Sequence, residues 1–215
     1  MQHKEITLRP EPLLDFPVEK VLQVKDFGAI AGDEETCTEE IQAAIDEAIR
    51  SGVPSRIEFD PGVYRIDVSH GRIALKIENA SDLIIDGNGC EFRITEPTKE
   101  LLTIDGSERI IVKNLGVDFE VLPHAQGWVT DVDPEAGNLT VELDPAYPDL
   151  DQPHFHEAHY KWAFIKDKDN PVAFKEGTEF RLFLKSWRRV GENRYRLQVE
   201  HKIKLQTVEV GDPFV

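Results

Sequence analysis

The chain of 215 residues has only two cysteines and lacks any long hydrophobic run. Cys37 and Cys90 lie outside the spacings that are typical of metal sites and redox motifs. We interpret both as small buried or half-buried residues, with a disulfide between them as the alternative. No apolar segment approaches the roughly 20 residues that a membrane-spanning helix requires, so no membrane partner is expected. No metal or other cofactor is predicted either.

Basic residues are scarce as well. The 25 lysines and arginines stand against 41 aspartates and glutamates, which gives a formal net charge of −16. A protein that binds nucleic acid needs a basic surface to neutralise phosphates, so this charge argues against such a partner. It is compatible with a neutral glycan and less so with a polyanionic one. The first residues also lack the basic start and apolar stretch of a secretory signal.

The most informative feature that is present is an internal repeat. Residues 74–94 (ALKIENASDLIIDGNGCEFRI) align on residues 101–121 with a shift of 27 positions. Self-similarity at such a period is typical of stacked architectures, in which each unit buries its apolar face against its neighbours. Short β-rich runs separated by Asp-Gly and Asn-Gly turns indicate coils of strands rather than helix pairs. Chance similarity of two strand pairs is the alternative.

The shift makes specific predictions about neighbouring residues. Apolar positions coincide, and opposite charges face each other across adjacent strands, which is mildly stabilising. The apolar pairs are Leu75 with Leu102, Ile77 with Ile104, Ile84 with Ile111, and Phe92 with Phe119. The charged pairs are Asp82 with Arg109, Asp86 with Lys113, and Arg93 with Glu120.

One helix stands out before the repeat. Thr36 and Glu39 have the spacing of a capping box, with Thr38 as an alternative N-cap. Apolar residues then recur with helical spacing, and Ser51-Gly52 is a typical end. The apolar stripe consists of Ile41, Ala44, Ile45, Ala48 and Ile49. Strands are predicted at 20–27, 56–59 and 63–68, with a turn at Asp60-Pro61-Gly62 between the last two.

This region resembles the N-terminal signature of the pectate-lyase-like superfamily of right-handed parallel β-helices. The signature reads roughly "DFGA–GD–TD–T–AIQ–AI" followed by "FPPGTY–I", and the resemblance covers about residues 21–120. The matching residues are Asp26, Phe27, Gly28, Ala29, Gly32, Asp33, Thr36, Ile41, Gln42, Ala44, Ile45, Pro61, Gly62, Tyr64 and Ile66. The chain departs from the signature at Glu34, Cys37 and Asp60. The resemblance implies that the amphipathic helix covers the open end of the first coil.

The pattern changes after Val121. Residues 128–132 and 139–143 read as a hairpin, and further strands are predicted at 163–166, 179–184, 194–200 and 207–210. Short, evenly spaced strands favour a small antiparallel barrel or sandwich. The passage after Asn114 and the terminal Val210-Gly211-Asp212 resemble the boundaries of the β-barrel that α-1,3-galactosidase-like glycoside hydrolases carry between coils. We therefore predict an extended lead (1–19), capped coils of a truncated parallel β-helix (20–122) and an inserted antiparallel β-domain (123–215).

Carboxylates are the first candidates for chemistry. In the 27-residue register Glu91 falls on Asp118, and two carboxylates about 5 Å apart suit a retaining glycosidase, whereas a wider gap suits an inverting one. Asp118 and Glu91 are thus candidate catalytic residues in a saccharide groove. The alternative is that both are merely solvated surface positions. No dedicated calcium loop is present.

Histidines and aromatic residues provide further candidates. Trp128, His124 and Gln126 could contact a sugar, although core packing explains most of the aromatic residues. His154, His156 and His159 fall within six residues and could ligate a metal, but a polar loop is the simpler interpretation. Lys185, Arg188 and Arg189 form a small basic patch, either a hairpin end or a site for an acidic sugar. No phosphate loop, nucleophile elbow or Ser-His-Asp ordering is present.

The favoured function is carbohydrate processing by glycoside hydrolysis, with a glycan as ligand and an extracellular or periplasmic location implied by the resemblance. In the family that the chain resembles, the catalytic acids lie on later coils, so the 215 residues are expected to be catalytically incomplete. A non-catalytic glycan-binding scaffold of the tail-spike type and a uronate lyase or epimerase are the alternatives. The charge of −16 counts against the lyase.

Overall fold

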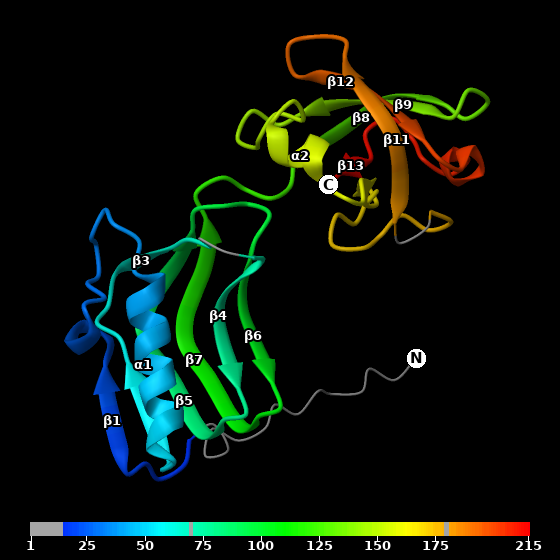
Figure 1. Ribbon diagram of the computed structural model, residues 1–215. Helices are drawn as coiled ribbons and strands as arrows, with labels where there is room; N and C mark the ends of the chain where they lie inside the picture. The colour runs from blue at the N-terminus through cyan, green and yellow to red at the C-terminus, as the bar shows by residue number, and fades with distance from the viewer. Residues whose placement is uncertain (1–14, 69–70, 179–180) are drawn as a thin grey trace, which may run out of the picture. The chain divides into compact units, whose positions relative to one another are not determined.

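The computed structural model describes residues 15–68, 71–178 and 181–215, and it is rich in β-structure (Figure 1). The chain divides into two compact units, residues 1–120 and residues 121–215. Of the extended lead predicted for residues 1–19, residues 1–14 lie outside the described part. Residues 15–18 have no regular secondary structure.

The first unit is built from parallel strands around one long central strand. Strand β5 pairs in parallel with β2 and β3 along one side and with β7 along the other, and β1 extends the sheet beside β2. Strands β4 and β6 form a separate parallel pair. The bounds are β1 Lys20–Gln23, β2 Ser55–Glu58, β3 Val63–Ile66, β4 Ile73–Glu78, β5 Ser81–Ile94, β6 Glu100–Asp105 and β7 Glu108–Phe119.

The register of the first half of the repeat is the one that the sequence predicts. Leu75 lies opposite Leu102 and Ile77 opposite Ile104 in the β4–β6 pair. Ile84 lies opposite Ile111 in the β5–β7 pair. These pairings confirm the 27-residue stacking for these segments.

Two of the predicted charge pairs accompany this register. Arg109 hydrogen-bonds Asp82, and this bond holds the pKa of the Asp82 carboxyl below its usual value. Lys113 Nζ lies 3.6 Å from Asp86 Oδ2. Both pairs are thus confirmed.

The predicted strand at 20–27 is correct only in its first half. After β1 the chain turns into the short 3-10 helix η2, Val24–Phe27. The backbone N–H of Gly28 donates to the carbonyl of Lys25, and Ala29 donates to that of Val24. Gly28 has φ 105°, a left-handed conformation that glycine adopts without strain, so the strand cannot continue.

Helix α1 (Thr38–Ser51) has the buried stripe that its periodicity predicts, but its N-terminus differs. Cys37 is the N-cap and makes no side-chain capping bond. The Thr38 hydroxyl instead bonds Asp67, and Thr36 bridges Arg65 in parallel fashion. Neither threonine is the N-cap, because the helix begins at Thr38, whose hydroxyl is bonded to Asp67, and the backbone of Thr36 pairs with Arg65. The predicted end is confirmed, with Gly52 at φ 66°.

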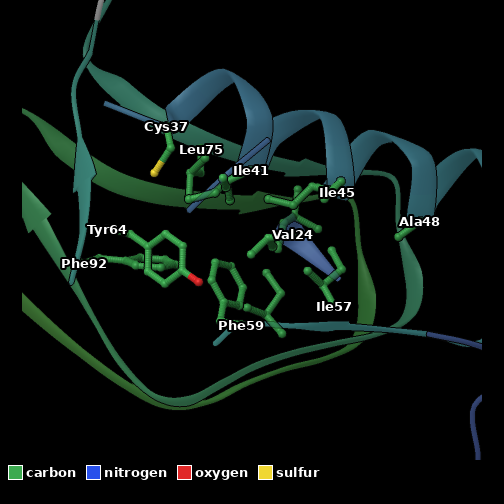
Figure 2. Packing of buried hydrophobic residues seen from close by; sticks show 14 of the residues in the cluster. Val24, Cys37, Ile41, Ile45, Ala48, Ile57, Phe59, Tyr64, Leu75 and Phe92 are labelled. Carbon is green, nitrogen blue, oxygen red and sulfur yellow. The ribbon is translucent and has the colours of Figure 1, made fainter. Parts of the chain in front are cut away.

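The core of the first unit lies beneath this helix (Figure 2). Ile41 and Ile45 point from α1 toward the rings of Phe59, Tyr64 and Phe92. The ring centroid of Phe59 lies 5.3 Å from that of Tyr64 and 5.2 Å from that of Phe92. The apolar face of the helix therefore packs on the core that these parallel strands form.

The apolar residues of β6 and β7 are less well covered. On β6 and β7 the apolar residues Ile104, Val112 and Val117 are 47%, 39% and 48% exposed, whereas Leu75 and Ile77 on β4 are buried. Apolar burial therefore decreases from the helix-covered layers to the β6 and β7 layer.

The second unit is a nearly closed antiparallel barrel. Its sheet runs in the order β10-β11-β12-β9-β8-β13, and Ile165, just after β10, bridges Phe214 of β13. The bounds are β8 Gly127–Asp133, β9 Asn138–Leu143, β10 Trp162–Ala163, β11 Leu182–Arg189, β12 Arg194–Val199 and β13 Pro213–Phe214. Its helical elements are α2, Pro153–Glu157, and η3, Lys202–Leu205. Alternating side chains such as Val129, Val141 and Leu197 fill the interior.

The hairpin predicted at 128–143 is confirmed as β8 and β9. The strand predicted at 194–200 corresponds to β12, and the one at 163–166 is a shorter β10 followed by single bridges. The strand predicted at 179–184 lies partly outside the described residues. The prediction at 207–210 is wrong, because the chain turns there before β13. No helix among the described residues could span a membrane.

The helix cap provides a direct test of the packing. Replacing Ile45, which is fully buried, with alanine should lower the free energy of unfolding by about 2–5 kcal/mol, because it leaves a cavity against the core. Asp46→Ala is the matched control, since it removes only an exposed bond to Gln42 and should cost about 0.5 kcal/mol or less. Urea unfolding followed by circular dichroism measures both. Equal effects would contradict the proposed packing of α1.

The two cysteines are buried free thiols, so the disulfide alternative is wrong. Burial raises the pKa of Cys37 to about 12 and that of Cys90 to about 11. The reactive thiolate is therefore rare at pH 8, and alkylation by iodoacetamide should be slower than for a free thiol by about two orders of magnitude or more. In urea both should react at the ordinary rate, as intact mass would show. Rapid labelling before unfolding would contradict this burial.

Candidate functional site

The predicted catalytic carboxylates lie on the polar face of β5 and β7, but not opposite each other. Glu91 is the registered neighbour of Gly116, and Asp118 is the neighbour of Arg93. The predicted pairing of Phe92 with Phe119 is wrong for the same reason, since Phe92 lies beside Val117. The 27-residue register thus ends within β5.

A bulge causes this change. Between Asp86 and Cys90 the strand β5 advances by two more residues than β7 does between Lys113 and Leu115. Gly87 lies where a Cβ atom would meet Leu115 Cβ at 2.5 Å, so only glycine fits. The Asp-Gly-Asn-Gly segment at residues 86–89 looks like a turn in the sequence, and here it accommodates two extra residues in one strand. Every later pairing is shifted by two.

The shift also changes the ion pairs. Arg93 does not meet Glu120 as predicted but bonds Glu91, with Arg93 Nε 3.0 Å from Glu91 Oε1. Glu120 instead accepts from Arg65 Nε at 2.6 Å. This bond lowers the pKa of Glu120, so Glu120 is ionised at neutral pH and is not suited to donate a proton.

Asp118 differs from its neighbours because no ion pair holds it among the described residues. It is exposed, and its Oδ1 accepts a 2.8 Å hydrogen bond from the backbone N–H of Phe119. Its position relative to Glu91 is diagonal, one strand over and two residues along, which corresponds to about 7–8 Å between backbones.

Two shallow hollows border this face. One of about 420 Å³ is lined by Asp33, Glu34, Arg65, Arg93 and Glu120 together with Gly32 and Val63. The other, of about 540 Å³, is lined by residues 88–91 and 114–116 and includes Glu91 and two asparagines, Asn88 and Asn114. Carboxylates, guanidinium groups and amides are the side chains that hydrogen-bond sugar hydroxyls. The polar face therefore offers both donors and acceptors.

In the second unit, the structure brings His124 and Gln126 together. The ring nitrogen Nε2 of His124 lies 3.1 Å from Gln126 Nε2, and its ring lies 5.5 Å from that of Tyr147. Burial lowers the pKa of His124, which favours a neutral imidazole. Trp128 lies further along on β8, opposite Glu142, and is 48% exposed. Its exposed indole can stack on a sugar ring.

The three histidines of the 154–159 segment do not converge. Each ring packs against a different aromatic residue, because α2 and the following turn point them in different directions: His154 against Phe155, His156 against Trp187 and His159 against Tyr160. No group of three or more His, Cys, Asp or Glu in the described part of the chain could hold a metal. The candidate metal set is not supported.

A polar cluster around one buried hydroxyl was not predicted from the sequence. The hydroxyl of Tyr195, which is fully buried on β12, bonds both Asp149 and Asp151. Arg189, part of the predicted basic patch, bonds the same two carboxylates. Burial raises the pKa of Asp149, but hydrogen bonds from Tyr195, Asp151 and Arg189 outweigh it and leave the pKa low. This network closes the loop after β9 onto β12, and only the alternation that places Tyr195 inward hinted at it.

Comparison with known proteins adds one finding. No protein-family model matches the chain. The chain is similar to Alpha-1,3-galactosidase B of Bacteroides thetaiotaomicron, with 33% identity over 141 residues. The match covers 58% of this chain and 22% of that protein, so the chain corresponds to about a fifth of the length of this curated relative. This similarity supports a relationship between the chain and glycoside hydrolases.

Disulfide trapping distinguishes the two possible registers. Arg93→Cys with Asp118→Cys should form a disulfide under mild oxidation, since neighbours on adjacent strands lie about 4.8 Å apart. Glu91→Cys with Asp118→Cys is the matched control and should not, because its diagonal spacing exceeds the usual reach. Non-reducing electrophoresis and peptide mapping report the bond. The opposite result would restore the uninterrupted 27-residue register.

Proposed function

We propose that the chain is part of a carbohydrate-active protein of the glycoside hydrolase type, with a galactose-containing glycan as ligand. The observation that carries the proposal is the similarity to a protein named as an α-1,3-galactosidase. The similarity covers about a fifth of that relative. A hydrolytic activity of this chain is therefore a proposal.

We further propose that the first unit is the beginning of a parallel β-helix. Two features support this architecture: the parallel stacking of β4 on β6 and of β5 on β7, and the helix that covers the first layers. In such a stack the polar faces of successive strands form one continuous surface, which suits an extended saccharide. The second unit then corresponds to the antiparallel barrel that follows these coils in the sequence.

Within this proposal, Asp118 of the first unit is the residue that contacts the glycan, and Trp128 of the second unit is a separate candidate for a sugar contact. Asp118 is an exposed carboxylate without an ion pair among the described residues, so it is available to accept from sugar hydroxyls. Trp128 offers an exposed aromatic face. His124, whose ring lies beside that of Tyr147, and Gln126, which contacts His124, are further polar groups of the segment that precedes Trp128.

Binding of galactosyl-α-1,3-galactose to the purified chain tests the proposal. We expect saturable binding by calorimetry, and we expect Asp118→Asn to weaken it about tenfold, because a neutral amide oxygen accepts a weaker hydrogen bond than a carboxylate does. Asp105→Asn, a change of an exposed carboxylate on β6, is the matched control and should have no effect.

The products of incubation separate the remaining functions. Release of galactose would support hydrolysis by these residues, and the α or β form of the released sugar, read by NMR, would show whether inversion occurs. Binding without release would favour a non-catalytic glycan module. Failure to bind any galactoside, with the chain folded, would refute the proposal.

A further inference from the structure

Most arginines of the described chain have a carboxylate partner. This is expected, because acidic residues far outnumber basic ones. The paired arginines are Arg50, Arg56, Arg65, Arg72, Arg93, Arg109, Arg189 and Arg194. Arg181 lies over the Trp162 ring. Arg188 and Arg196 remain, and neither side chain has an ion-pair or hydrogen-bond partner within the residues that the structure describes.

These two arginines lie directly opposite each other. Arg188 on β11 is the registered neighbour of Arg196 on the antiparallel strand β12. Tyr195 and Leu197, on either side of Arg196, are fully buried, so Arg196 points out of the barrel. Both arginines are exposed. The barrel thus presents two guanidinium groups on one outward surface.

This arrangement is unfavourable in the free protein. Like charges directly opposite on neighbouring strands are destabilising, and here no carboxylate of the described chain relieves them. On β12 itself the contrast is clear, because Arg194, two residues earlier, is paired with Glu142 of β9. An anion placed between Arg188 and Arg196 would remove the repulsion and gain hydrogen bonds from both planar guanidinium groups.

We propose that Arg188 and Arg196 bind the single anionic group, a carboxylate or a sulfate, of an acidic sugar. That the anion belongs to a saccharide rests on the proposed function. The next row supports it, because Ser186 and Gln198 pair there and provide a hydroxyl and an amide for sugar hydroxyls. Both are exposed. The net charge of −16 disfavours extended polyanions such as nucleic acid, so the site takes a sugar with an isolated charge.

Titration of the isotope-labelled chain tests this site. Galactose 6-sulfate and galacturonate are the probes, galactose is the uncharged control, and backbone amide shifts on β11 and β12 are the readout. We expect saturable shifts there for both acidic sugars, with affinity at least tenfold higher than for galactose. Arg188→Gln with Arg196→Gln should weaken binding of the acidic sugars about ten- to hundredfold. The double variant should unfold at an unchanged or higher temperature, since the repulsion is gone.

Two controls define the specificity. Arg50→Gln removes the same charge from an exposed position on α1 and should leave binding unchanged. Arg188→Lys with Arg196→Lys keeps both positive charges but removes the planar guanidinium groups, so this variant should bind the acidic sugars with intermediate affinity.

Three outcomes would overturn the inference: inorganic sulfate binding as tightly as galactose 6-sulfate, unchanged affinity in the Gln variant, or tighter binding of a DNA oligonucleotide. If galactosyl-α-1,3-galactose binds at Asp118 and the acidic sugars do not bind here, this inference alone fails. If no neutral galactoside binds but the acidic sugars do, the proposed function fails and this anion site remains.

Discussion

The first unit depends on the parallel pairing of one strand. β5 (Ser81–Ile94) pairs in parallel with β2, β3 and β7, so it joins the strands on its two sides into one sheet. Its buried side chains, including Ile85 and Phe92, belong to the core that Ile41 and Ile45 cover. Since β2, β3 and β7 each pair with β5, loss of this strand would leave all three without their shared neighbour.

The bulge in β5 determines what the polar face can do. If the repeat continued unbroken, Glu91 and Asp118 would be neighbours and would repel each other. The two extra residues around Gly87 place Arg93 beside Asp118 instead, and Arg93 also bonds Glu91. Bulges are common near functional sites because they redirect side chains without breaking the sheet. Here the bulge turns a ladder of like charges into an alternation of acid and base.

In the barrel, polar contacts hold the loops in place. Asp149 and Asp151 are bound to Tyr195 and Arg189. Asp212 is fully buried and accepts a 3.1 Å bond from Lys175. A small closed sheet has little interior to bury, so such contacts order the long connections between its strands. Against this background of satisfied charges, the facing pair Arg188 and Arg196 stands apart.

Local sequence alone determined the amphipathic helix, its end at Gly52, and the hairpin of β8 and β9, because periodicity and turn residues specify these elements. The 27-residue repeat determined the register of Leu75, Ile77 and Ile84. The similarity to a glycoside hydrolase was also readable from motifs. Only the tertiary structure decided that neither Thr36 nor Thr38 is the N-cap, because their partners lie 29 residues away. It also decided which residues lie beside Glu91 and Asp118. The physical reason is that a two-residue bulge costs little locally yet moves every later neighbour, and side-chain partners far apart in the chain leave no periodic signal.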